Sequence, residues 1–103
     1  MLEICIMETG IKEEVLEEIK HLAKKHGIKK VILFGSRARA DFHKTSDIDL
    51  AVSGGNKTMF YLDVEEKTST LLMFDVVDID TDIQPELRES ITKEGVVIYE
   101  EIQ

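Results

Sequence analysis

The sequence predicts a small mixed β-sheet flanked by helices, an architecture of the α/β or α+β class. Helical and strand-like segments alternate along the chain, the links between them are short, and no internal repeat or low-complexity tract interrupts the order. The 103 residues, of which 43% are hydrophobic, suit one compact domain with one core. We therefore expect a single domain over residues 1–103, with a loosely ordered N-terminal stretch at 1–9.

The first half of the chain predicts a helix, a helical turn and two strands. Apolar residues recur at helical spacing over 11–26, with lysines and glutamates between them. The β-rich run at 30–34 stops at Gly35, and residues 37–40 suit a helical turn. Acidic and apolar residues alternate at the start of 47–52, so we expect this segment to form a half-buried strand.

The second half predicts two more helices and two more strands. Asn56 can cap a helix that carries several apolar residues, and a polar break then leads into a strand at 71–78. Pro85 and Gly95 bracket a last helix, because proline favours the first helical position and glycine the position after the end. Residues 96–99 are expected to form a fourth strand.

Two aspartates in the second expected strand are the first sign of chemistry. Side chains two residues apart on a strand point to the same face, so Asp47 and Asp49 should stand side by side with Ile48 and Leu50 turned into the core. Two carboxylates on one face repel each other, and a divalent cation removes that repulsion. Mg²⁺ suits this position because it takes hard oxygen ligands, usually one or two carboxylates together with substrate phosphates.

A turn shortly before these aspartates is the second sign. Gly35 and Ser36 end a strand, where a glycine lets the backbone approach a ligand and the first amides of a helical turn point at anions. Arg37 and Arg39 follow, and a guanidinium there could reach a phosphate oxygen. A phosphate-binding turn beside metal-binding carboxylates is what transfer of a nucleotidyl group requires.

A two-metal site usually needs a further carboxylate, and Asp75 is the best candidate. It lies between Phe74 and Val76 in an apolar strand, where an acid is costly unless it is paired. Asp78 and Asp80 compete for this role. They follow where the strand gives way to a loop, however, and contact with water at a strand end would explain them.

These residues resemble the pattern of polymerase β-like nucleotidyltransferases, in which a glycine-serine pair and a spacer precede two aspartates separated by one residue. The chain has Gly35-Ser36 and then Ser46-Asp47-Ile48-Asp49-Leu50. The third acid in Phe74-Asp75-Val76-Val77-Asp78 and the ending Glu94-Gly95-Val96-Val97-Ile98-Tyr99 are also similar to the family. The resemblance extends from residue 30 to 99 and implies the polymerase β-like nucleotidyltransferase fold.

Within that superfamily the chain is most similar to the minimal, single-domain nucleotidyltransferases, which are typically encoded beside a HEPN-domain toxin as its antitoxin. The resemblance implies ATP as donor, a two-ion Mg²⁺ site, and adenylylation of a tyrosine hydroxyl on a HEPN-type partner, with which the chain can form an oligomer. Asp47 and Asp49 would bind both ions, and Asp75 would complete the ion of the nucleophile. The residues expected to contact the nucleotide phosphates are Gly35, Ser36, Arg37, Arg39 and Ser46.

One residue departs from the family pattern. Many relatives have glycine where this chain has Ala40, directly after Arg39. Alanine is a mild change if the residue is helical and a more serious one if its φ must be positive. The departure concerns the local loop and leaves the metal site unaffected.

Charge and cysteine content restrict the possible partners. The net charge of −8 is a poor match for a surface that must attract a polyanion, so we expect no direct binding of nucleic acid. The single cysteine, Cys5, excludes an internal disulfide. Because no signal-type segment or long apolar run is found, we expect a cytoplasmic protein that does not contact a membrane.

Two other functions remain open at this point. The chain could be a binding module that neutralises a basic partner by occlusion, with a weak or vestigial nucleotide site. It could also be an enzyme that modifies a small hydroxylated cation of the aminoglycoside kind, which a negative surface would attract. Replacing Asp47 and Asp49 by asparagine separates the enzyme from the binding module.

Overall fold

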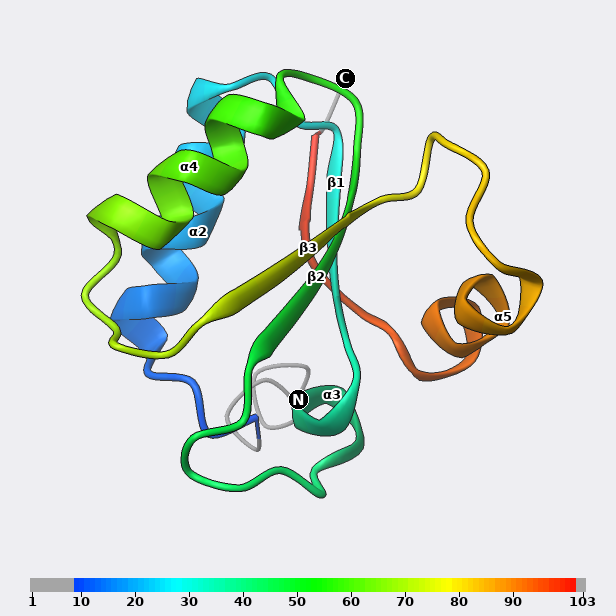
Figure 1. Cartoon of the computed structure of the whole chain (residues 1–103). Coiled ribbons are helices and arrows are strands. Elements are labelled where there is room, and N and C mark those ends of the chain that lie inside the picture. The colour runs from blue at the N-terminus through cyan, green and yellow to red at the C-terminus, as the bar shows by residue number, and fades with distance from the viewer. Residues whose placement is uncertain (1–8, 102–103) are drawn as a thin grey trace.

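One four-stranded sheet forms the centre of the computed structural model, which describes residues 9–101. The strand order is β3-β2-β1-β4; β1 is antiparallel to both β2 and β4, whereas β2 and β3 are parallel. Figure 1 views the sheet from the side of β3. The strands are β1 (Lys30–Phe34), β2 (Ile48–Ser53), β3 (Phe74–Asp78) and β4 (Val96–Glu100). This arrangement confirms the expected mixed sheet.

Helices cover the two faces of the sheet unequally. The described helices are α2 (Glu13–Lys25), α3 (Ser36–Arg39), α4 (Lys57–Lys67) and α5 (Pro85–Glu94). α2 and α4 lie together on one face and α5 lies on the other, as Figure 1 shows. The order of helices and strands is the order expected from the sequence. No helix in residues 9–101 is long and apolar enough to cross a membrane.

The alternation of side chains along each strand produces two separate apolar clusters. On the face of α2 and α4, Leu33 and Leu50 of the sheet pack with Ile19 and Phe60 of the helices, and all four are fully buried. On the other face a smaller cluster joins Phe34, Ala51 and Ile91. The first cluster accounts for the helical spacing of apolar residues in α2, because that spacing turns one side of the helix toward the sheet.

The N-terminal expectation falls mainly outside the described part of the chain. Residues 1–8, which include Cys5, are not described. Thr9 belonged to the stretch expected to be loose, but it is 1% exposed and its Oγ1 accepts a hydrogen bond from the Ile11 N–H. Thr9 is thus packed against the rest of the protein, and the expected loose order of the N-terminal stretch stays a prediction.

The third strand is shorter than its sequence suggests. A strand was expected over 71–78, but β3 begins at Phe74, and Leu71 is fully exposed. β2 begins at Ile48, whose N–H donates to the Met73 carbonyl, so the residues before Met73 have no partner strand to extend along. The apolar run of the sequence is thus partly a surface loop.

Asp80 ties the turn after β2 to the end of β3. Its carboxylate accepts from the Ser53 hydroxyl at 2.9 Å and from the Gly54 N–H at 2.8 Å, and Lys57 Nζ lies 2.9 Å away. These partners, the Gly54 amide first, lower the pKa of Asp80 to about 2. Asp80 therefore has a structural role here, in place of the role as third metal-binding acid for which it competed with Asp75.

We expect Asp80→Asn to lower the free energy of unfolding at pH 7 by roughly 1 kcal/mol, a value reduced for solvent screening because the side chain is 46% exposed. The folded-state pKa is depressed, so the contribution is present above the unfolded value near 3.8 and is lost as the pH falls toward 2. Urea unfolding of both proteins from pH 7 to pH 2 measures this. Asp82→Asn is the matched control, and an equal difference at every pH would contradict the assignment.

Ala40 ends α3 in a left-handed backbone conformation. Its φ is 65° and its ψ is 26°, and its N–H donates to the Ser36 carbonyl. It is the only residue other than glycine with a positive φ in residues 9–101. This is the more serious of the two outcomes anticipated for the missing glycine, because a Cβ is disfavoured in this region.

We expect Ala40→Gly to raise the free energy of unfolding by about 1 kcal/mol, since glycine adopts this conformation without a Cβ clash. For a chain of this length that corresponds to a melting temperature higher by roughly 4–8 °C. Thermal unfolding followed by circular dichroism measures the shift. Ala38→Gly, inside the same helical turn, should shift it in the opposite direction, and a lower melting temperature for Ala40→Gly would refute the argument.

Candidate active site

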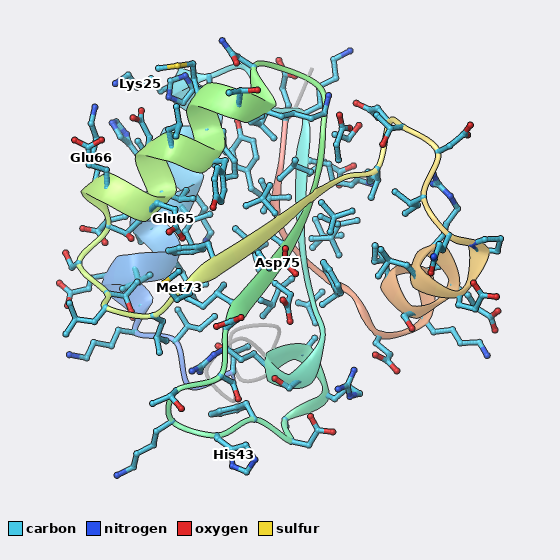
Figure 2. The ribbon with its side chains drawn as sticks, viewed as in Figure 1. Lys25, His43, Glu65, Glu66, Met73 and Asp75 are labelled. Carbon is cyan, nitrogen blue, oxygen red and sulfur yellow. The ribbon has the colours of Figure 1, made fainter. Side chains whose placement is uncertain are left out.

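Strand register brings the three predicted acids to one face of the sheet. Asp49 of β2 is the direct partner of Asp75 of β3. Asp47 directly precedes β2 and lies two residues from Asp49, so it faces the same side. This is the side of α5, because Ala51, two residues further along, packs against Ile91 there. Figure 2 shows Asp75 on β3, at the edge of the sheet.

The three carboxylates repel one another. Removal from water raises the pKa of Asp49 above its usual value, and the Asp75 and Asp47 carboxylates raise it further, whereas Arg39 lowers it. No group of three such side chains in residues 9–101 is already close enough to hold an ion by itself. The donor set nevertheless fits Mg²⁺, which is commonly held by one or two carboxylates together with substrate phosphates.

Gly35 stands directly beside the acids. It follows Phe34, which pairs with Asp49 in the register of β1 and β2. Its φ is 77°, and a Cβ added there would collide with the Asp49 carboxylate. Glycine is therefore required at this position both for its backbone and for its lack of a side chain. Ser36 begins α3 at the same point, so the first amides of this turn lie next to the acids.

Arg37 is committed to the main chain. It is 2% exposed, and its guanidinium lies 4.7 Å from the centre of the Phe42 ring. Its nitrogens donate, over 2.9 to 3.5 Å, to the carbonyls of Thr9, His43, Lys44 and Ser46. Arg37 therefore holds the loop that leads to Asp47, and the phosphate contact predicted for it stays a prediction. No pattern in the sequence indicates this role, because the partners are carbonyl groups common to every residue.

Arg39 lies at the border of the site. Its side chain is 43% exposed, and it contacts Asp41 at 3.2 Å and Glu94 at 2.9 Å. Through Glu94 it joins α3 to the end of α5. Its positive charge also lowers the pKa of Asp49. Its phosphate contact stays a prediction.

Ser46 closes the loop before the acids. Its Oγ accepts from the His43 N–H at 2.7 Å, and its own N–H donates to the His43 carbonyl at 3.1 Å. The hydroxyl keeps its proton available for a further acceptor. The contact of Ser46 with a nucleotide also stays a prediction.

Asp78 lies away from the acids. It pairs with Val52 at the far end of β3, three residues beyond Asp75 and thus on the opposite face. Its carboxylate lies 3.5 Å from Lys57, which also binds Asp80. Of the three candidates for the third acid, only Asp75 is brought next to Asp49.

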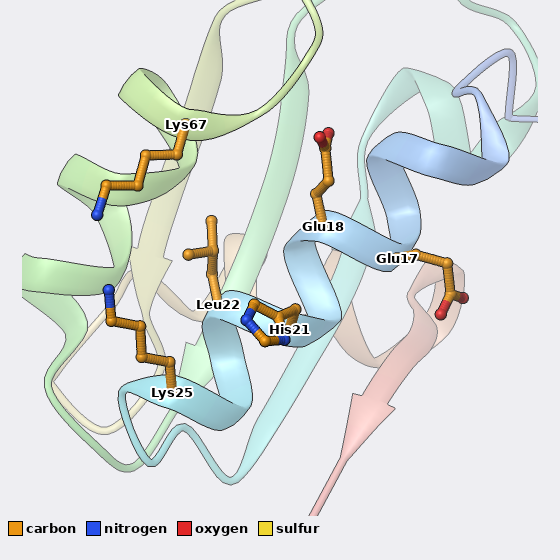
Figure 3. A pocket seen from close by; sticks show the side chains of 6 residues that line it. All are labelled: Glu17, Glu18, His21, Leu22, Lys25 and Lys67. Atoms are coloured by element: carbon orange, nitrogen blue, oxygen red, sulfur yellow. The ribbon is translucent and has the colours of Figure 1, made fainter.

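Two open hollows differ in their relation to the acids. The hollow in Figure 3, of about 410 Å³, lies between α2 and α4 and is lined by residues such as His21, Lys25 and Lys67. It is on the sheet face opposite the acids. A groove of about 370 Å³ runs along the edge of β3 and includes Asp75. Of these two hollows, the groove along β3 is the one that adjoins the three acids.

Three crystal structures share the fold. A toxin–antitoxin with AMP-PNP has a TM-score of 0.69 and 19% identity, over 84% of this chain and 73% of that chain. Two mutants of the MntA-HpeT toxin–antitoxin have TM-scores of 0.65 and 0.63 with 18% and 20% identity. The first mutant covers 84% of this chain and 73% of its own, and the second covers 79% and 68%. A search of the curated proteins found no match.

The part of the chain that carries the acids and the glycine turn matches the sequence model of a known protein family. The model for polymerase β nucleotidyltransferases matches residues 17–103. This span contains the whole sheet, Gly35 and the three acids. The mixed sheet with helices on both faces is also the fold expected from the resemblance. The chain belongs to the polymerase β nucleotidyltransferase family.

Proposed function

We propose that the chain transfers the adenylyl group of ATP to a hydroxyl, with Asp47, Asp49 and Asp75 holding Mg²⁺. The observation that carries the proposal is the pairing of Asp49 with Asp75 directly beside Gly35. Carboxylates that repel one another gain most from a divalent cation, and the lack of a side chain at Gly35 lets the Asp49 carboxylate lie against the turn whose amides can bind a phosphate. Mg²⁺, when bound, would neutralise charge on the triphosphate and lower the pKa of the acceptor hydroxyl.

The roles of the protein's own groups follow from their positions. The amides of the Gly35-Ser36 turn would bind the β- and γ-phosphates. Asp75 would orient the acceptor hydroxyl and accept its proton, while the acceptor oxygen forms a bond to the α-phosphorus. The bond between that phosphorus and the bridging oxygen breaks, and pyrophosphate leaves. Arg37 contributes by holding the loop before Asp47 in place.

The acceptor we propose is a tyrosine of a HEPN-type toxin, so that the chain acts as an antitoxin in the cytoplasm. The similar structures are toxin–antitoxins, and one of them contains AMP-PNP. The groove that contains Asp75 is open, so a partner protein that supplies part of the pocket suits it. The net charge of −8 favours association with a basic partner.

We expect the Asp47→Asn/Asp49→Asn double variant to lose adenylyl transfer by about 100-fold or more, because even indirect contacts to metal ligands contribute 10- to 100-fold. The experiment incubates a HEPN-type protein encoded beside this chain with the chain, ATP and Mg²⁺, and measures its intact mass. A gain of adenylyl units that the double variant does not produce supports the proposal, and Asp82→Asn is the control. If neither form changes the mass while both bind the partner and suppress its toxicity, the chain is a binding module.

The Asp49→Asn variant should also distinguish the effect of this carboxylate on metal binding from its effect on the stability of the fold. Because the pKa of Asp49 is raised, folding disfavours its charge, and the variant should melt higher than the wild type at pH 7 without divalent ions. This advantage should shrink as the pH falls and the wild-type carboxyl takes up its proton. AMP-PNP with Mg²⁺ at 100 times its dissociation constant should stabilise the wild type by about 2.7 kcal/mol and the variant far less. Equal stabilisation of both proteins would argue against Asp49 as a ligand.

A further inference from the structure

The outer side of β3 is a free strand edge. β3 ends the sheet, and none of residues 9–101 forms a strand beside its outer side. The Ile48 N–H donates to the Met73 carbonyl and the Ile79 N–H donates to the Val52 carbonyl. Along a strand, the N–H and C=O of one residue point to one side and those of the next residue point to the other. Because Met73 and Ile79 bind β2, the odd-numbered residues of β3 face β2 and the even-numbered ones face outward. Val76 belongs to the outward set.

One main-chain group at each end of this edge is already bound. The Phe74 N–H, at the start, donates to Glu65 Oε1 at 2.8 Å. The Asp78 carbonyl, at the end, accepts from the Thr81 hydroxyl at 2.8 Å. The N–H and C=O of Val76 remain for another strand, together with the outward Phe74 C=O and Asp78 N–H. The open segment is therefore short and centred on the residue after Asp75.

A groove accompanies the open segment. It is formed by the outer edge of β3 and by α4, from which Lys57, Thr58 and Tyr61 line it. Tyr61 is 38% exposed, and Met73, just before β3, is 60% exposed. Figure 2 shows Met73, Glu65 and Asp75 along this side of the molecule. An extended peptide would find main-chain partners at β3 on one side and the side chains of α4, Tyr61 among them, on the other.

The charge of the groove indicates what kind of peptide fits. Asp75 and Asp78 line it, and Glu65 lies at its start. Lys57 is the only cation among the lining residues, and it contacts both Asp78 and Asp80. The acids therefore outnumber the base, in line with the net charge of −8. A segment with basic residues complements this surface.

We propose that the open edge of β3 binds the acceptor segment of the partner protein as an added antiparallel strand. The residue opposite Val76 then exchanges both main-chain hydrogen bonds with it. The residue opposite Asp75 forms the close, non-hydrogen-bonded pair, with Cα atoms about 4.5 Å apart and both side chains on the same face. That face carries the three acids, so a hydroxyl side chain at this position is delivered to Asp75. The occupant is an extended, basic segment with a hydroxyl residue at its centre.

This inference rests on the proposed function, and its geometry explains how so small a chain could select an acceptor. Main-chain pairing gives affinity without a specific sequence, and alternate side chains give selectivity. One set of side chains faces the acids, and the other faces Tyr61 and α4. The register with Val76 decides which residue of the segment receives the adenylyl group.

The test uses two synthetic peptides with the full chain. The first has lysines at both ends, alternating valine and threonine, and one central tyrosine; its twin has phenylalanine in place of tyrosine and carries a dye. Anisotropy of the twin measures docking, and the mass of the first peptide after incubation with ATP and Mg²⁺ measures transfer. The key variant is Val76→Pro, which removes the outward N–H and is tolerated at a strand edge.

Two comparisons isolate the effect of strand pairing. Val76→Ala keeps the N–H and removes most of the side chain, so it controls for lost packing. Tyr61→Lys changes the α4 side of the groove, and Leu62→Lys, with the same change of charge on a neighbouring residue outside the groove, is its control. Val76→Pro and Tyr61→Lys should each weaken binding of the twin about 10-fold or more, whereas the controls should stay within about 3-fold. Tyr61→Lys decides the test if Val76→Pro does not fold.

Each outcome separates the docking proposal from the proposed function. Weaker binding confined to Val76→Pro and Tyr61→Lys supports the edge as the docking site, even if the tyrosine peptide gains no mass, in which case the intact mass of the HEPN-type protein decides the transfer activity. Modification of the tyrosine peptide at the same rate by the wild type and both variants overturns edge docking and leaves the activity intact. Absence of binding by the wild type at millimolar peptide also overturns edge docking.

Discussion

The register of three neighbouring strands is the constraint on which the candidate site depends. Phe34 of β1 pairs with Asp49 of β2, and Asp49 pairs with Asp75 of β3, so Gly35 and two acids are aligned across the sheet. A slip of one residue between β2 and its neighbours would turn the acids into the apolar core and bring core residues to the surface. The burial of Ile48, Leu50 and Val52 opposes that slip and thereby fixes the site.

The unequal cover of the sheet explains how one small domain can be both stable and open. The face under α2 and α4 is closed by the larger apolar cluster, which includes buried side chains from these two helices and from all four strands. On the other face α5 covers only the region around Phe34, Ala51 and Ile91. The acids occupy the uncovered part, where their repulsion and partial loss of water oppose folding. The closed face supplies the stability that this arrangement requires.

Much of the fold was predictable because it depends on local patterns, whereas the less predictable features depend on contacts distant in sequence. The period-two alternation around Asp47 and Asp49 and the helical spacing in α2 indicated the elements and the inward face of each. The sequence could not indicate that Arg37 binds four carbonyls or that His26 pairs with Asp63 at 2.6 Å, 37 residues away. The start of β3 also depends on a distant contact, since a strand ends where its partner does.

The contact of Glu65 with the start of β3 affects how readily copies of the chain aggregate in a concentrated solution. A long exposed strand edge is a template for sheet growth between identical molecules, and proteins that keep one are prone to aggregate. By accepting the Phe74 N–H, Glu65 shortens the open edge at one end and adds a negative charge beside it. Copies of this acidic chain would repel each other at that edge, so the edge can stay available to a foreign segment without seeding fibres.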